Sequence, residues 1–171
     1  MEVKIYIPHP ALQEYVLNIS TVNAELPEGV SNVVTPYPPT PFQSLMFYCN
    51  VPVSMSRTAD DGFDKQSLSM MIGPQFSRVN IKVEKGLKAI RVDFLPGGMY
   101  RMLGIPMHEL FDEGFDARLF FTTEMRSINE QLQNTASLAE GKTIVEDFLL
   151  KRTNNLKQIL PFDSASTNFV E

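Results

Sequence analysis

The sequence predicts an α+β fold in which short strands, forming a small barrel or jelly roll, precede a helical segment. Up to about residue 95, apolar residues alternate with polar ones or form short runs, as in half-buried strands. After Leu95-Pro96-Gly97-Gly98 the apolar spacing becomes helical. Strands followed by helices are typical of α+β proteins, and short, evenly spaced strands favour a barrel. We therefore expect a barrel over 1–98, helices packed on it over 99–162 and a linker over 163–171.

The clearest strand pattern lies in two neighbouring runs. Val79, Ile81 and Val83 alternate with polar residues, and Lys88–Leu95 repeats the pattern after the turn Glu84-Lys85-Gly86. The two runs therefore predict a β-hairpin. Shorter candidate strands precede them: Leu17–Ala24, Leu45–Cys49, Val51–Met55 and Ser67–Ile72. The proline-rich stretch Pro27–Pro41 predicts a loop or an irregular edge.

Helices are expected where the spacing is close to 3.6 residues and where capping residues occur. Met99–Leu103 is a short helix that Gly104 ends, and Ser137-Leu138-Ala139-Glu140 fits a capping box that opens a longer one. Further predicted helices are His9–Val16, Pro106–Phe111 and the segment that carries Phe121, Met125, Ile128 and Leu132.

Composition excludes several classes of protein. The chain has 15 Lys and Arg against 20 Asp and Glu, a net charge of −5, which does not suit a nucleic-acid binder that must neutralise phosphates. A single cysteine, Cys49, excludes an internal disulfide and a multi-cysteine metal site. No apolar run approaches the roughly 20 residues of a membrane span, and no signal peptide opens the chain. We expect a cytoplasmic protein that does not contact membranes.

The residues of catalysis are also scarce. Only His9 and His108 are available as imidazole ligands, and they are far apart in the sequence, so we expect neither a metal site nor a cofactor. Cys49 lies in an apolar run, where a cysteine behaves as a small hydrophobic residue. No G-x-S-x-G motif is present. We expect no catalytic residue and no enzyme activity.

The candidate binding residues are Tyr48, Met70, Arg91 and Asp93. Arg91 and Asp93 stand two apart on one face of a strand whose other face is apolar. They either form a solvated outer face or point into a barrel cavity and hold a polar ligand. Tyr48 and Met70 are further cavity candidates, although core packing explains both equally well.

Val145, Phe148 and Leu149 form one stripe of the predicted C-terminal helix. Such a stripe packs on its own domain or forms half of a two-fold dimer interface. The three residues are therefore candidate interface residues of a homodimer.

Four segments also carry a family resemblance: Tyr6–Val16, Leu45–Tyr48, Ile72–Gln75 and Ile90–Pro106. Together, in this order and spacing, they resemble the N-terminal domain of AraC-family transcription regulators, particularly a Bacteroidetes-like group. In that group the last segment is a strand ending in F-x-P-x-G, then a short helix and a G-x-P turn. The likeness covers nearly the whole chain.

The resemblance implies a cupin-like barrel, helices that pair two subunits, and a C-terminal pair of helix-turn-helix motifs that reads DNA. That last part would begin near residue 165, so we expect the polypeptide to continue into it. The chain would be a regulatory domain that binds an unidentified small effector and reaches DNA only through the absent part. Two alternatives stay open: a free-standing cupin-like isomerase or hydrolase, and a ligand-free pairing module whose barrel is plugged by Phe47, Phe63, Phe76 and Phe94.

Overall fold

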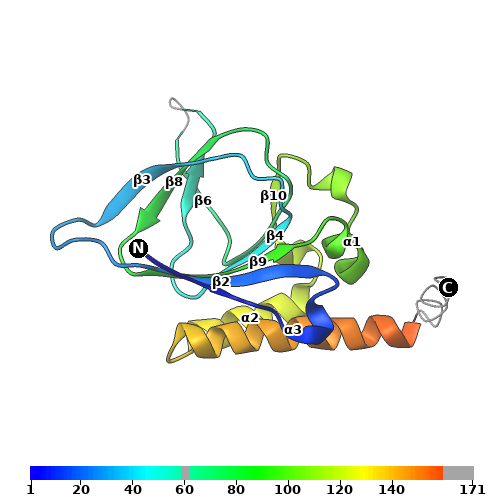
Figure 1. Cartoon of the computed structure of the whole chain (residues 1–171). Helices are drawn as coiled ribbons and strands as arrows, with labels where there is room; N and C mark the ends of the chain where they lie inside the picture. The colour runs from blue at the N-terminus through cyan, green and yellow to red at the C-terminus, as the bar shows by residue number, and fades with distance from the viewer. Residues whose placement is uncertain (59–61, 160–171) are drawn as a thin grey trace.

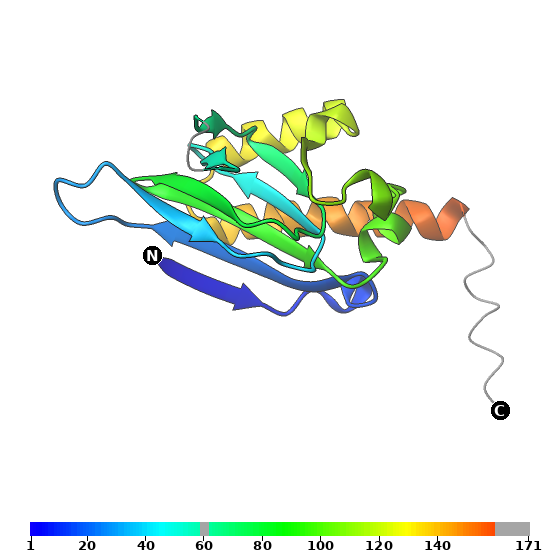
Figure 2. The same cartoon turned by 90° about the horizontal axis from the view of Figure 1, so that it is seen from above.

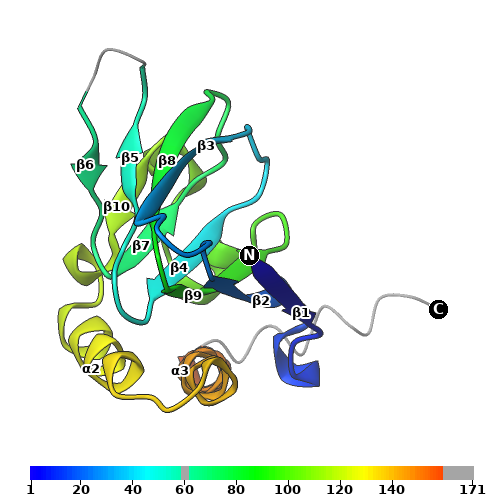
Figure 3. The same ribbon diagram turned by 90° about the vertical axis from the view of Figure 1, so that its left-hand side faces the viewer.

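A computed structural model describes residues 1–58 and 62–159, and it confirms the α+β class. The described residues form two antiparallel sheets and three α-helices, stacked in layers. Figures 1 and 3 show one sheet above, the larger sheet in the middle and the two longer helices beneath it. The described strands close into no barrel, so the barrel or jelly roll expected over 1–98 is found as two facing sheets.

The larger sheet, sheet A, has six strands in the order β1-β2-β9-β4-β7-β10. Every neighbouring pair is antiparallel. The strands are β1 (Glu2–Tyr6), β2 (Val16–Ala24), β4 (Ser44–Tyr48), β7 (Ser69–Ile72), β9 (Leu87–Phe94) and β10 (Gly114–Asp116). β10 lies within the segment 99–162, which was expected to be helical. The strand was not predicted because three residues are too few to show alternation.

The smaller sheet, sheet B, has the order β3-β8-β5-β6. Its strands are β3 (Asn32–Tyr37), β5 (Ser54–Ser56), β6 (Asp64–Lys65) and β8 (Val79–Glu84). β3 lies within Pro27–Pro41, where a loop or an irregular edge was expected, and it is a regular strand at the edge of the sheet. It is an edge strand, where a proline such as Pro36 is tolerated because one side of the strand needs no ladder hydrogen bonds.

The hairpin predicted from β8 and β9 is wrong, although both strands exist. β8 pairs with β3 and β5, whereas β9 pairs with β2 and β4. The turn between them is a corner that changes sheets: Lys85 donates its N–H to the Ser31 carbonyl, and Gly86 donates to the Ala24 carbonyl. Gly86 adopts φ 76°, which favours glycine.

The α-helices are α1 (Gly98–Leu103), α2 (Thr122–Gln133) and α3 (Leu138–Ile159). Three 3₁₀ turns accompany them: η1 (Pro10–Leu12), η2 (Met107–Glu109) and η3 (Ala117–Leu119). The predicted helices at His9–Val16 and Pro106–Phe111 are thus reduced to single turns. Figure 2 shows α3 running beneath the sheets along the width of the molecule. No described helix combines the length and the apolar character needed to cross a bilayer.

Local signals correctly located the starts of α3 and α1. The Ser137 hydroxyl accepts the Glu140 N–H at 3.2 Å, and the Glu140 carboxylate accepts the Ala136 N–H at 3.0 Å, so the capping box holds with a one-residue shift. At α1, a Cβ on Gly98 would lie 2.1 Å from the Tyr15 carbonyl oxygen. Only glycine fits there, because the strand-to-helix turn packs directly against the backbone after η1.

Sheet A has an apolar core on each face. The larger core lies between sheet A and the helices and includes Ile90, Val92 and Phe94 of β9. It also contains Val145 and Leu149, both 0% exposed, and Phe148, 7% exposed. These three side chains already pack within their own chain, which favours the first of the two interpretations of the stripe, packing on its own domain. The linker expected over 163–171, and the last residues of the helical segment 99–162, lie outside the described residues.

Candidate functional site

A cavity of about 310 Å³ lies between the two sheets. Most of its wall is apolar, with side chains from both sheets, including Met46, Met70, Ile81, Val83 and Leu87. β3 contributes Thr35, Pro36 and Tyr37, and β1 contributes Val3, which is 49% exposed. The cavity therefore extends to β1 and β3, which are edge strands of sheet A and of sheet B. We call it the inter-sheet cavity.

Strand register explains which side chains of sheet A reach the cavity. Residues paired across neighbouring antiparallel strands share a face. Arg91 pairs with Ser20 on one side and with Met46 on the other, and Met46 pairs with Met70. Ala89 pairs with Tyr48 in the next row. These rows form the floor of the inter-sheet cavity, while the alternate residues of β9 face the helices.

A polar cluster surrounds Arg91 at one part of this floor. Its Nε donates to Asp93 Oδ1 at 2.7 Å, and its Nη2 donates to the Ser44 hydroxyl at 3.0 Å. The Ser44 hydroxyl in turn donates to the same Asp93 oxygen at 2.6 Å. The Arg91 Nη1 donates to the Tyr37 hydroxyl of β3, so the cluster joins sheet A to the edge of sheet B.

The cluster keeps Arg91 charged inside the protein. Burial by itself lowers the pKa of the guanidinium, but Tyr37 and Asp93 outweigh it and the pKa is raised. The side chains of Arg91 and Asp93 are only 18% and 13% exposed, so each charge depends on the other for compensation. The pair adds no net charge to the cavity.

Tyr48 is the other polar group of the floor. Its side chain lines the inter-sheet cavity and is 5% exposed, yet its hydroxyl has no hydrogen-bond partner among the described residues. Burial raises the pKa of Tyr48 above its ordinary value. The hydroxyl therefore stays protonated and is available to donate or accept a hydrogen bond.

The structure brings the four predicted site residues together. Tyr48, Met70 and Arg91 line the inter-sheet cavity, and Asp93 lies beside it as the partner of Arg91. Of the two interpretations of the Arg91 and Asp93 face, the geometry favours the interior one. Tyr37 was missed, because it lies in the proline-rich stretch that was expected to be irregular. Ser44 was missed too, since nothing in its sequence context distinguishes it.

The aromatic residues expected to plug a barrel do not fill this space. Phe47 and Phe94 belong to the core between sheet A and the helices. Phe63 and Phe76 are 39% and 60% exposed. Cys49 also packs in the helix-side core, where burial raises the pKa of its thiol to about 11, which favours the unreactive protonated form. Among the described residues no three His, Cys, Asp or Glu side chains cluster in a way that suits a metal ion.

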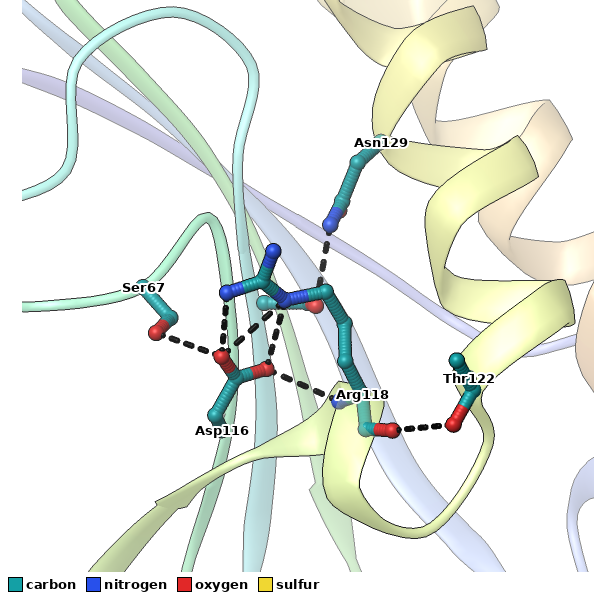
Figure 4. A network of polar contacts seen from close by, with 6 residues as sticks. Ser67, Asp116, Arg118, Thr122 and Asn129 are labelled. Carbon is teal, nitrogen blue, oxygen red and sulfur yellow. Dashed lines mark hydrogen bonds and ion pairs between the residues drawn. The ribbon is translucent and has the colours of Figure 1, made fainter.

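A second polar network lies outside the cavity, where β10 leads into η3 and α2 (Figure 4). Asp116 accepts hydrogen bonds from the Arg118 guanidinium and from the Ser67 hydroxyl. Asn129 of α2 donates to the Ser69 hydroxyl of β7 at 3.2 Å. Hydrogen bonds from the Arg118 backbone and side chain lower the pKa of Asp116 despite its partial burial. The network fastens α2 to the edge of sheet A.

Comparison with known proteins adds a family but no activity. No curated protein matches the chain. A family model described as "Domain of unknown function (DUF6597)" matches residues 4–116. The match ends at Asp116, the last residue of β10, and so includes both sheets and nearly all of the cavity wall. Since it covers well over half of the sequence, the chain belongs to the DUF6597 family.

Proposed function

We propose that this chain is the sensing domain of an AraC-type transcription regulator. It takes a small effector into the inter-sheet cavity and passes the binding event through sheet A to the helices and onward to a DNA-binding domain elsewhere in the protein. The observation that carries the proposal is the cavity itself, with a buried polar cluster on an otherwise apolar floor. Concave, mostly apolar pockets with a few convergent polar groups are typical small-molecule sites, with volumes of about 300–1,000 Å³.

β9 provides a short physical route from the cavity to the helices. Ala89 and Arg91 face the cavity, whereas Ile90 and Val92 face the helix-side core. A Cβ on Gly141 of α3 would lie 2.9 Å from Cδ1 of Ile90, so helix and strand are in close contact. A ligand that displaces β9 therefore displaces the packing of α3. Such coupling changes DNA affinity only if the two arrangements bind the ligand differently.

The sequence resemblance supports the same function. The segment Ile90–Pro106, which most resembles AraC-type N-terminal domains, covers most of β9, the Gly97-Gly98 turn and α1. The two facing sheets are compatible with an open variant of the cupin-like container that the resemblance implies. Pairing with a second copy remains part of the proposal, although residues other than Val145 and Leu149 must form the interface.

DNA binding tests the regulatory role. The chain of 171 residues should not bind the DNA upstream of its gene in a fluorescence anisotropy titration, because its net charge of −5 repels phosphates. A longer polypeptide that continues into a helix-turn-helix region should bind that DNA. Tight, sequence-specific binding by the 171 residues alone would refute the proposal that a separate domain binds the DNA.

Substitutions on the cavity floor test the sensing role in that longer polypeptide. Ala89→Leu fills part of the inter-sheet cavity and should abolish the response of DNA binding to cell-derived small molecules. Lys88→Leu on the same strand is the matched control, because Lys88 is exposed and does not line the cavity. Loss of the response in both variants, or in neither, would count against sensing in this cavity.

A further inference from the structure

The inter-sheet cavity has a chemistry that selects its ligand. We infer that it binds an uncharged, largely apolar molecule with one hydrogen-bonding group, and discriminates against carboxylates and sugars. The inference rests on the proposed function in one respect, that the cavity is a ligand site. It follows from three observations: the apolar wall, the neutralised charge of Arg91 and the unpartnered hydroxyl of Tyr48.

The wall offers little to a sugar or polyol. Besides Arg91, its polar side chains are Thr35, Tyr37, Tyr48, Gln66 and Gln75, and aliphatic or thioether groups make up most of the rest. Each hydroxyl of a sugar that enters must give up hydrogen bonds with water, and an apolar wall replaces few of them. A molecule with a hydrocarbon or aromatic body gains from the same wall.

A carboxylate is disfavoured because the one charged side chain among the described lining residues is already paired. Nε of Arg91 is engaged by Asp93, Nη2 by Ser44 and Nη1 by Tyr37. A ligand carboxylate that approached Arg91 would lie near the Asp93 carboxylate and compete with it. The repulsion between the two anions and the loss of hydration both oppose binding.

A single hydrogen-bonding group on the ligand matches Tyr48. The Tyr48 side chain lies on the cavity floor, and its hydroxyl has no partner among the described residues, so it is free to bond to a ligand. A carbonyl or hydroxyl oxygen of the ligand would accept the Tyr48 proton while the apolar body lies against the methionines and aliphatic side chains. Tyr48 is thus the expected polar contact, and Arg91 positions Tyr37 at the cavity wall.

Equilibrium dialysis with two probes of the same skeleton tests the inference on the 171-residue chain. The probes are 2-acetylnaphthalene, which is neutral, and 2-naphthoate, which is anionic at pH 7. Glucose is the polyol probe. We expect the ketone to bind at least about ten-fold more tightly than the carboxylate, and glucose not to saturate the protein. Tyr48→Phe should weaken the ketone by about two- to ten-fold, the value of one neutral hydrogen bond.

Asp93→Asn tests the role of the paired charge. It replaces the carboxylate by a neutral amide of nearly the same shape and so leaves the guanidinium uncompensated. The preference should therefore shift toward 2-naphthoate by about ten-fold or more. Glu84→Gln is the matched control, because it makes the same change of charge at a carboxylate that pairs with Lys82 outside the cavity, and it should not move the preference. If the Asp93 variant does not fold by circular dichroism, the wild-type preference and the Tyr48 variant decide the question.

The outcomes separate this inference from the proposed function. Saturable binding of 2-naphthoate as tight as that of the ketone, or tight binding of glucose, would overturn the ligand class while leaving the cavity as a ligand site. If no probe binds, both the ligand class and the sensing cavity are refuted. Ketone binding that Tyr48→Phe leaves unchanged would refute the assigned polar contact and, with it, the inference.

Discussion

Removing either partner of the Arg91–Asp93 pair should destabilise the protein more than removing both. The Nε–Oδ1 distance is 2.7 Å and both side chains are more than four-fifths buried. Arg91→Met leaves an unpaired carboxylate between the sheets, and Asp93→Leu leaves an unpaired guanidinium. The double variant leaves no charge there, and apolar replacement of a buried pair is often nearly neutral.

The magnitude follows from the geometry. Two unit charges about 4 Å apart attract by about 4 kcal/mol at an effective dielectric constant of about 20. Breaking a fully buried pair costs about 3–5 kcal/mol. Because water retains some access to both groups, we expect each single substitution to lower the free energy of unfolding by about 2–4 kcal/mol. The double variant should lose about 1–2 kcal/mol, so the coupling energy should be about 2 kcal/mol or more.

Urea unfolding followed by circular dichroism gives the four free energies of this double-mutant cycle. Lys82 and Glu84 provide a matched control, since they form a pair of the same i, i+2 spacing on β8, but at 3.8 Å and with both side chains 35% exposed. Their cycle with Met and Leu should show a coupling below about 1 kcal/mol. Additivity within about 0.5 kcal/mol at Arg91 and Asp93 would refute the reasoning.

Three further predictions concern helix starts and the buried thiol. Ser137→Ala removes the N-cap of α3 and should lower the free energy of unfolding by about 1 kcal/mol in urea titration. Gly98→Ala forces a Cβ to 2.1 Å from the Tyr15 carbonyl and should cost about 3 kcal/mol or more, whereas Gly97→Ala, at φ 73° with open space around it, should cost about 1–2 kcal/mol. Burial raises the pKa of the Cys49 thiol from 9.0 to about 11. The stabilisation that the protonated thiol gives the folded state is therefore fully present below pH 9 and is lost as the pH rises toward 11, because the thiol of the unfolded chain ionises first. Urea midpoints of wild type and Cys49→Ala between pH 8 and 11 check this, and parallel pH profiles would contradict it.

The sequence predicted six of the ten described strands, missing β1, β3, β6 and β10, and it predicted the strand partners poorly. Alternation in β8 and β9 correctly indicated two half-buried strands, because alternation reports only that one face of a strand is covered. It does not report which strand lies alongside. At Lys85 and Gly86 the choice between hairpin and corner depends on carbonyls of Ser31 and Ala24, which are more than fifty residues away in the sequence. Nothing local to the turn encodes them.

The candidate site was predictable in part for the same reason. Arg91 and Asp93 were candidates because two charged residues share one face of a strand whose other face is apolar, and the structure places them between the sheets. Whether that face meets water or a second sheet depends on sheet B. The edge strand β3 of sheet B lies in a proline-rich stretch whose composition does not indicate a strand. Tyr37, the contact of Arg91 across the sheets, was therefore missed. The stripe of Val145 and Leu149 left two interpretations open for a different reason, because an apolar stripe looks the same whether sheet A or a second subunit covers it.

The helices form one structural unit with the strands, although the family match ends at Asp116. On the helix side of sheet A, Phe47, Ile90 and Val92 are 0% exposed only because α2 and α3 cover them. A chain cut after β10 would expose this face to water, at roughly 25 cal/mol for each square ångström of apolar surface. No flexible linker therefore separates the cavity from α3. A displacement of β9 by a ligand must be absorbed within one continuous core, and α3 is the element of that core that leads toward the C-terminal end of the chain.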